Sequence, residues 1–224
     1  MSVARIETYF VAGPAGRLEC FLKRPATGLV SGSTVAVVCH PHPIFGGSMH
    51  NKVVHAAAEA LAGLGMPVVR FNFRGVGRSA GAHDGGRGET GDLQAVLDDI
   101  AARFPGAPIL AAGYSFGAWV ALRVGCADPR VAALIGIAAP VGLYDFRFLR
   151  GCDRPLALIQ GEADPLAPIG LVLAFAAQLP GGGGVLPVAG AAHGFADHLE
   201  ELADRVARAV PAHLRPPLLP ASAG

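Results

Sequence analysis

The chain opens with two segments in which apolar and polar residues alternate, Arg5–Val11 and Leu18–Lys23. An alternation with a period of two residues is typical of a strand that buries one face. The residues between them, Gly13–Gly16, are glycine, proline and alanine and suit a tight turn. The pattern therefore predicts an antiparallel hairpin.

After the hairpin, short apolar runs alternate with longer segments of helical character. The predicted strands are Thr34–Cys39, Pro67–Phe73, Pro108–Ala112, Val131–Ala138, Pro155–Gln160 and Val185–Val188. The predicted helices are Ser48–Leu64, Glu89–Phe104, Phe116–Cys126, Pro168–Leu179 and Phe195–Val210. Apolar strands separated by helices predict an α/β fold, in which a mostly parallel sheet is covered by helices on both faces.

The alternation runs without an internal repeat or a linker, so residues 1–210 are expected to form a single domain. Pro211–Gly224 is rich in proline and alanine and predicts a tail that is frayed or laid on the surface. The helix expected over Pro168–Leu179 is apolar nearly all round, whereas an ordinary surface helix has a charged face. A contact between two copies of the chain would bury this helix, which suggests a homodimer.

Composition excludes several classes of protein. Of the 224 residues 52% are hydrophobic and 16% charged, which excludes a disordered chain. A net charge of +1, without a cluster of Lys or Arg, leaves no electrostatic basis for binding nucleic acid. The first residues lack the pattern of a signal region, and apolar stretches such as Val131–Leu143 are too short to span a bilayer. We expect a cytoplasmic protein with no membrane partner.

The four cysteines share no spacing that is typical of a metal or redox site. Buried, reduced thiols are the expected state of all four, which are Cys20, Cys39, Cys126 and Cys152.

Gly113–Gly117 reads Gly-Tyr-Ser-Phe-Gly and joins a predicted strand to a predicted helix. A serine in such a turn projects from the edge of the sheet, and small residues two before and two after it allow the backbones to approach closely. A second Gly-x-Ser-x-Gly copy, Gly77–Gly81, is followed by Ala82–Gly88, which cannot begin a helix. Ser115 is therefore the candidate nucleophile, and Ser79 is expected to be a surface loop residue.

A serine hydroxyl is a weak nucleophile unless a base takes its proton and a third group orients that base. In an open α/β sheet these partners come from loops at the carboxyl ends of later strands. Asp164 lies in a tight acidic loop after one such strand, and His193 follows the last strand, just before a glycine. The order Ser115, Asp164, His193 is that of a nucleophile-elbow enzyme. Glu162 is an alternative acid, and Asp164 could instead serve only as a turn residue.

The negative oxygen that forms during acyl transfer needs N–H donors already in place. The backbone N–H of Phe116, at the start of the helix, is the first expected donor. The second should come from the loop His40–Ser48, in which both prolines lack an N–H. We expect His42 to be this donor, with Ile44 and Phe45 as alternatives.

The pair His40-x-His42 also has a metal interpretation. Hydrolases with such a pair build it on the first strand of a barrel, and this chain is short for eight strand–helix units. No further His, Asp or Cys cluster completes a ligand set, so no metal is expected. His40 is expected to brace the loop from beneath.

Gly75–Ala80 matches a dinucleotide fingerprint, but glycine and aspartate follow it where a helix should begin. No cofactor is therefore expected. Arg74 or Arg78 could meet an anionic group of a substrate, and a salt bridge to Glu89 or Asp92 is the favoured alternative.

The connection Pro140–Arg154 leaves room for little more than one short helix. Enzymes of this architecture that cover their cleft usually insert a cap here, so the sequence predicts an open cleft without a lid. Tyr144, Phe146 and Phe148 could line that cleft, but packing of the connection onto the core is favoured for them.

Together these residues resemble the α/β-hydrolase superfamily. Cys39–Val54, Phe71–Ser79 and Gly113–Gly117 are similar to a group of small, lidless bacterial members known mostly as predicted serine hydrolases. The resemblance runs from about residue 5 to residue 205. It implies an eight-stranded sheet whose second strand is antiparallel, and it brings no particular substrate.

The sequence therefore predicts a serine hydrolase that cleaves carboxylic esters or thioesters of small or accessible acyl groups through an acyl-enzyme. A small-molecule substrate is expected. Two alternatives stay open: acyl transfer or perhydrolysis by the same residues, and a non-catalytic binding protein with this fold.

Overall fold

The structure is a computed structural model that describes residues 5–25, 32–181 and 183–216. Its strands are β1 (Arg5–Gly13), β2 (Gly16–Arg24), β3 (Val35–Cys39), β4 (Val68–Phe71), β5 (Ile109–Tyr114), β6 (Val131–Ile137), β7 (Leu156–Gly161) and β8 (Gly184–Val188). Its helices are α1 (Lys52–Gly63), α2 (Arg87–Arg103), α3 (Phe116–Ala127), α4 (Ile169–Ala176) and α5 (Leu199–Ala209). Short 3₁₀ helices are η1 (Pro43–Phe45), η2 (Arg147–Gly151) and η3 (Ala212–Leu214). In the described part of the chain, no helix is long and apolar enough to cross a membrane.

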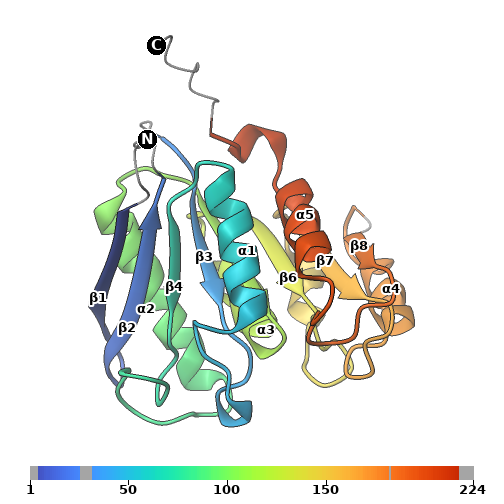
Figure 1. The fold of residues 1–224 in the computed structure, drawn as a ribbon, viewed down its shortest axis with the longest axis horizontal. Coiled ribbons are helices and arrows are strands. Elements are labelled where there is room, and N and C mark those ends of the chain that lie inside the picture. Colours follow the sequence, from blue (N-terminus) through green and yellow to red (C-terminus); the bar gives the residue numbers. More distant parts are fainter. Residues whose placement is uncertain (1–4, 26–31, 182, 217–224) are drawn as a thin grey trace.

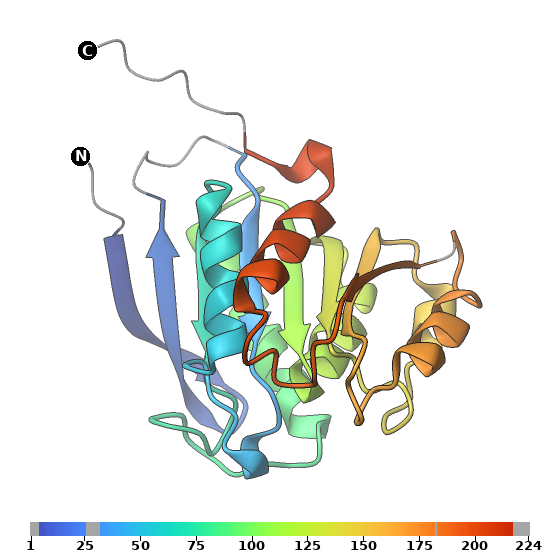
Figure 2. The same ribbon diagram turned by 45° about the vertical axis from the view of Figure 1, so that its right-hand side comes forward.

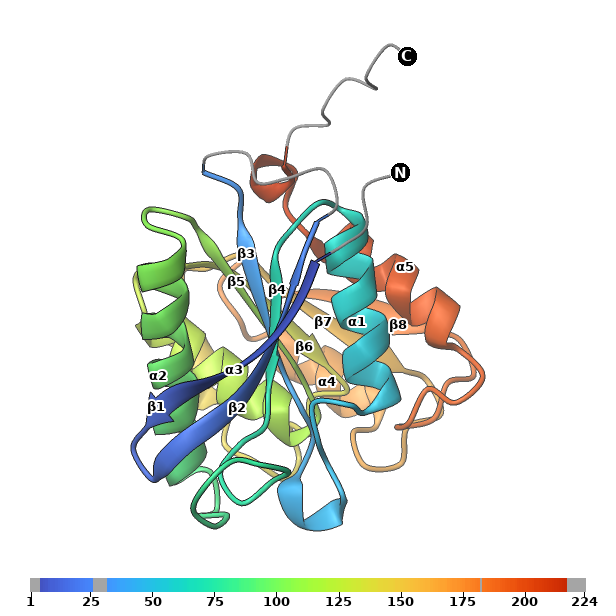
Figure 3. The same ribbon diagram turned by 60° about the vertical axis from the view of Figure 1, so that its left-hand side comes forward.

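Eight strands form one sheet in the order β1-β2-β4-β3-β5-β6-β7-β8 (Figure 1). β2 pairs antiparallel with both β1 and β4, and the remaining neighbours pair parallel. Helices α1 and α5 lie side by side on one face (Figure 2), and α2 and α3 cover the other (Figure 3). The predicted fold class, an α/β-hydrolase fold with an antiparallel second strand, is confirmed.

The alternation of side chains along the central strands divides the core into two layers. On β3, Val35, Val37 and Cys39 pack into the layer under α2 and α3, whereas Ala36 and Val38 pack into the layer under α1. All five are fully buried. A strand covered on both faces must be apolar throughout, which is why its sequence shows no alternation.

Two helices begin four residues later than predicted, and each has a local cause. The Asn51 side chain accepts a hydrogen bond from the Val53 N–H at 2.9 Å, so α1 starts at Lys52 and not at Ser48. Phe195 has a φ of +49°, a left-handed conformation that a helix cannot contain, so α5 starts only after it.

The connection between β6 and β7 contains η2 and no cap domain, which confirms the lidless prediction. Phe146 is buried in the core, and Tyr144 and Phe148 are partly buried against it. The three aromatic rings therefore pack the connection onto the body of the protein, as favoured above.

Two expectations concern the last part of the chain. Leu214 in η3 is buried, so this part of the tail lies against the core, and residues 217–224 lie outside the described residues.

On α4, which has no charged residue, Leu171 and Leu173 are 52% and 50% exposed. The homodimer that would cover them stays a prediction, as does the division into one domain and a tail.

The cysteines are free thiols, and Cys20, Cys39 and Cys152 are buried as predicted, while Cys126 is partly exposed. Burial raises the pKa of Cys20 to about 12, so this thiol is neutral at physiological pH.

The expectation that Ser79 is a surface residue is wrong. Its hydroxyl donates to the Asn72 carbonyl at 2.7 Å and accepts the Glu19 N–H at 2.9 Å, and the residue is buried. The reason is that the loop after β4 folds back along β2, where the Ala80 N–H also donates to the Arg17 carbonyl at 2.8 Å. Ser79 thus joins two backbone segments.

Replacing Ser79 by Ala should lower the free energy of unfolding by about 1–3 kcal/mol, because a buried N–H and a buried carbonyl lose their partner. Thr90→Ala is the matched control, since its hydroxyl bonds to the Arg87 carbonyl on an exposed helix surface. Urea denaturation measures both, and equal effects of the two substitutions would contradict the structural role of Ser79.

Candidate active site

Ser115 occupies the sharp turn between β5 and α3, with φ +56° and ψ −120°. This positive φ is strained for a residue with a side chain. A Cβ on Gly113 would lie 2.1 Å from the Gly117 carbonyl oxygen, and a Cβ on Gly117 would lie 2.4 Å from the His40 carbonyl oxygen. Glycine is therefore required at both positions, because the helix start, the strand and the end of β3 meet without space between them.

The structure brings the predicted nucleophile, base and acid together. His193 Nε2 lies 2.9 Å from Ser115 Oγ, and His193 Nδ1 lies 2.8 Å from Asp164 Oδ2. The three residues follow β5, β7 and β8, so their loops meet at the carboxyl edge of the parallel sheet. The alternative acid, Glu162, is exposed to solvent. The geometry is that of a hydroxyl, an imidazole and a carboxylate in line.

Asp164 is buried and fully hydrogen-bonded. Its Oδ2 also accepts from Gln160 Nε2 at 2.9 Å, and its Oδ1 accepts the N–H groups of Leu166 at 2.9 Å and Ala167 at 3.0 Å. Burial raises the pKa of Asp164, but the hydrogen bond from His193 and the backbone N–H donors outweigh it and hold the pKa below its ordinary value. The carboxylate is therefore ionised at neutral pH and can accept a hydrogen bond from the Nδ1–H group of His193.

Two residues that hold the site were missed by the sequence analysis. The Tyr114 hydroxyl donates to the His193 carbonyl at 3.0 Å, so the residue before Ser115 also fixes the loop of His193. Gln160 supports Asp164 and donates to the Ala167 carbonyl at 2.7 Å. A polar glutamine inside an otherwise apolar strand was a signal for the second residue, and nothing in the local sequence pointed to the first.

The loop between β3 and α1 carries His42, whose ring lies against that of Phe116, the residue after Ser115. The His42 carbonyl accepts the N–H groups of Phe45 at 3.2 Å and Gly47 at 3.1 Å, and the Ile44 N–H donates to His42 Nδ1 at 3.3 Å. The N–H groups of Ile44 and Phe45, the two alternative oxyanion donors, thus already donate hydrogen bonds within this turn. Within the described residues, the backbone N–H groups of His42 and Phe116 donate no hydrogen bond, and the two rings lie 5.0 Å apart. This geometry favours His42 and Phe116 as the oxyanion donors.

His40 is fully buried beneath this loop. Its Nε2 accepts the Phe73 N–H at 3.0 Å, so Nδ1 carries the proton and donates to the Pro41 carbonyl at 2.7 Å. Burial lowers the pKa of His40 to about 4, which keeps the ring neutral. His40 braces the loop as expected, and both of its ring nitrogens are engaged.

The two arginines of the neighbouring loop are used within the protein. Arg74 Nη2 lies 2.7 Å from Asp92 Oδ1, and Arg74 Nε lies 3.0 Å from Asp92 Oδ2. The guanidinium of Arg78 lies 4.7 Å from the ring centre of Phe10. The salt-bridge alternative is therefore correct for Arg74.

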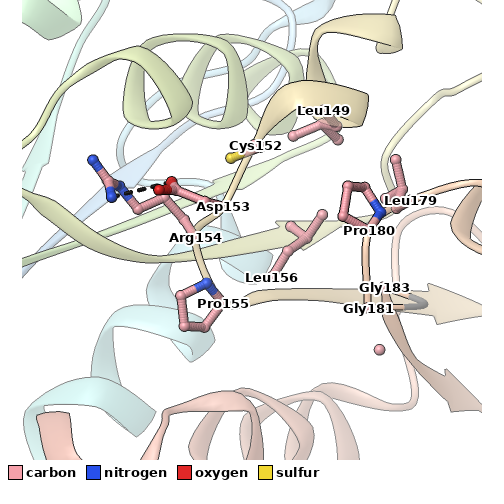
Figure 4. Close-up of a pocket in the computed structure, with 11 residues that line it drawn as sticks. Leu149, Cys152, Asp153, Arg154, Pro155, Leu156, Leu179, Pro180, Gly181 and Gly183 are labelled. Atoms are coloured by element: carbon pink, nitrogen blue, oxygen red, sulfur yellow. Dashed lines mark ion pairs between the residues drawn. The ribbon is translucent and has the colours of Figure 1, made fainter.

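A cavity of about 320 Å³ lies elsewhere, where β7 and β8 begin (Figure 4). Leu149, Cys152 and Leu156 contribute to its wall, beside an ion pair between Asp153 and Arg154 at 3.1 Å. It contains none of the three catalytic candidates. Ligands of such sheets bind outside the carboxyl ends of the strands, so this cavity is not the expected substrate site.

Comparison with known proteins agrees with this geometry. Residues 34–147, about half of the chain, match the family described as serine aminopeptidase, S33. A solved structure from Xanthomonas campestris, described as an α/β serine hydrolase without a lid, is 37% identical. It superposes with a TM-score of 0.87 and covers 96% of this chain and 97% of its own.

Two relatives in sequence are longer than this chain. An uncharacterized protein of Rickettsia prowazekii is 40% identical over 158 residues, which are 69% of this chain and 65% of that protein. The mitochondrial palmitoyl-protein thioesterase ABHD10 of Rattus norvegicus is 33% identical over 131 residues, which are 53% of this chain and 41% of that protein. The match thus spans less than two thirds of each relative.

Gly117→Ala should lower the free energy of unfolding by about 1–3 kcal/mol, because the added methyl group meets a backbone carbonyl that cannot move aside. Gly170→Ala is the control, since open space surrounds that position on α4. It should be neutral or stabilising by up to about 1 kcal/mol. Equal stability of the two variants in urea would refute the close approach.

The lowered pKa of Asp164 predicts a pH dependence of stability. A carboxyl whose pKa is lower in the folded protein stabilises it above the ordinary unfolded value of about 3.9, and this contribution is lost as the pH falls through the folded value. Asp164→Asn should therefore remove part of the fall in unfolding free energy below about pH 4. Parallel curves for wild type and variant would contradict this, and the exposed Asp197→Asn serves as control.

Proposed function

Because the chain belongs to the serine hydrolase family described as serine aminopeptidase, S33, and has the lidless α/β-hydrolase fold, we propose that it is an esterase or thioesterase. It cleaves carboxylic esters or thioesters of small or accessible acyl groups through an acyl-enzyme. The observation that carries this proposal is the continuous contact from Asp164 through His193 to Ser115, at 2.8 and 2.9 Å.

In the acylation step, Ser115 Oγ attacks the carbonyl carbon of the substrate while His193 Nε2 takes its proton. The carbonyl oxygen becomes negative and receives the N–H groups of Phe116 and His42, at the positive end of α3. His193 then gives the proton to the departing alcohol or thiol. A bond between Ser115 and the acyl group remains.

In the deacylation step, water replaces the leaving group. His193 takes a proton from the attacking water and returns it to Ser115 Oγ as the acyl group leaves as a carboxylic acid. The ionised Asp164 keeps the Nδ1 proton of His193 in place and stabilises the imidazolium in both steps. No cofactor or metal takes part in this sequence.

The exposed side chains near the site support this substrate class. Large apolar side chains are exposed on the segments that follow β3, β6 and β7, namely Ile44 (69%), Phe45 (84%), Leu143 (66%) and Leu166 (52%). An apolar rim at an open edge favours uncharged acyl groups. The name of the rat relative, a palmitoyl-protein thioesterase, supports a thioester as one substrate to be tested.

Ser115→Ala should lower the hydrolysis of p-nitrophenyl acetate by a factor of about 10⁴ or more, because the nucleophile is lost. A fluorophosphonate probe should label the wild type and not this variant. Ser79→Ala, which carries the other Gly-x-Ser-x-Gly serine, should keep both the activity and the labelling. Retained hydrolysis in Ser115→Ala would end the proposal.

The same assay separates the alternatives. A panel of acetyl, butyryl and octanoyl esters, an acyl-CoA thioester and an aminoacyl p-nitroanilide compares ester, thioester and peptidase activity. Product analysis with an added alcohol or peroxide identifies acyl transfer or perhydrolysis. A folded wild type that the probe does not label would instead favour a non-catalytic binding protein. A small-molecule substrate and a cytoplasmic location remain predictions.

A further inference from the structure

A second histidine–carboxylate pair lies beside the loop of His42, with His83 in the segment between β4 and α2 and Glu89 in the first turn of α2. His83 Nδ1 is 2.8 Å from Glu89 Oε1, and Glu89 is fully buried. The Glu89 carboxylate also accepts the N–H groups of Asp84 at 3.0 Å and Gly86 at 2.7 Å. The reaction described above does not use this pair.

The ring of His83 contacts both residues that are proposed to bind the oxyanion. Its centre lies 4.7 Å from that of His42 and 5.6 Å from that of Phe116, while His42 and Phe116 are 5.0 Å apart. Each of the three rings therefore contacts the other two. The loops that carry His42 and His83 project from the lower edge of the molecule in Figure 1.

The segment from His42 to Gly46 makes few other contacts with the body of the protein. From His42 to Gly46 no residue is buried, and Ile44 and Phe45 extend into solvent. The ring of His42 is thus the part of this turn that packs on the body of the protein, through Phe116 and His83. Removal of one of these two neighbours leaves the ring, and with it the His42 N–H, less firmly placed.

The charges explain how the pair holds its position. Burial raises the pKa of Glu89, but the N–H groups of Asp84 and Gly86 and the nearby His83 outweigh it, so the pKa is lowered and the carboxylate is ionised. Burial lowers the pKa of His42, and the proximity of His83 lowers it further. The His83 and Glu89 side chains are in direct contact, and the contact is an ion pair when His83 is protonated.

We propose that His83, held by Glu89, is a positioning residue that fixes the His42 ring against Phe116 and so keeps both oxyanion N–H groups in place. This inference rests on the proposed function. His83 touches no reacting atom in this scheme and acts through its two neighbours.

His83→Ala should lower kcat for p-nitrophenyl acetate about tenfold and leave KM nearly unchanged, because the oxyanion forms only in the transition state. The inhibition constant of an alkylboronic acid, whose tetrahedral adduct on Ser115 places an oxygen in the oxyanion site, should rise by about the same factor. His55→Ala, an exposed histidine on α1, is the matched control and should change neither. His83→Asn repeats the test with a second side chain that lacks the ring.

Glu89→Gln keeps the shape of the side chain and removes its charge. It should lower kcat by less than His83→Ala does. The double variant with His83→Ala should be no slower than His83→Ala alone, because Glu89 acts through His83. If Glu89 serves only as the cap of α2, the thermal midpoint will fall while kcat stays unchanged. That result overturns the role of Glu89.

The outcomes separate this inference from the function on which it rests. If the wild type is active, Ser115→Ala is inactive, and the folded His83 variants keep the wild-type kcat and boronic acid affinity, the positioning role is refuted and the hydrolase remains. If the wild type neither hydrolyses esters nor reacts with the fluorophosphonate probe, both proposals are overturned.

Discussion

The structure depends on the close approach of three backbone segments at the end of β5. The strand, the start of α3 and the end of β3 meet where Gly113 and Gly117 leave no room for a side chain. This contact forces the positive φ of Ser115 and turns its hydroxyl out of the sheet. It also places the loop of His42 next to the first turn of α3, so one close approach positions both the proposed nucleophile and the proposed oxyanion donors.

The other two residues of the proposed catalytic site come from different strands. Asp164 and His193 are supplied by strands on the far side of β6, and each loop is held by its own hydrogen bonds. Tyr114 connects the two halves, because its backbone belongs to the nucleophile strand and its hydroxyl holds the His193 carbonyl. Several independent hydrogen bonds therefore hold the loops of the site in place.

Most features that were predicted correctly from the sequence are encoded in short local patterns. The strand–turn–helix around Ser115 and the loops of Asp164 and His193 could be recognised because each is contained in a few consecutive residues. Contacts between distant segments could not. The hydroxyl of Ser79 bonds to a strand 60 residues away, and Tyr114 bonds to a loop 79 residues away. The contact of His83 with His42 also depends on how two separate loops come together, which no short motif encodes.

The short connection between β6 and β7 has a consequence for the catalytic cycle. In the proposed mechanism, the described residues place no domain above Ser115, so bulk water would reach an acylated serine and a product would diffuse away without an opening motion. A bulky group attached to the substrate would extend into solvent, because no cap domain would contact it. For the proposed hydrolase, selectivity would therefore depend on direct contacts at the edge of the sheet, and a large molecule with one exposed acyl group would be sterically as acceptable as a small one.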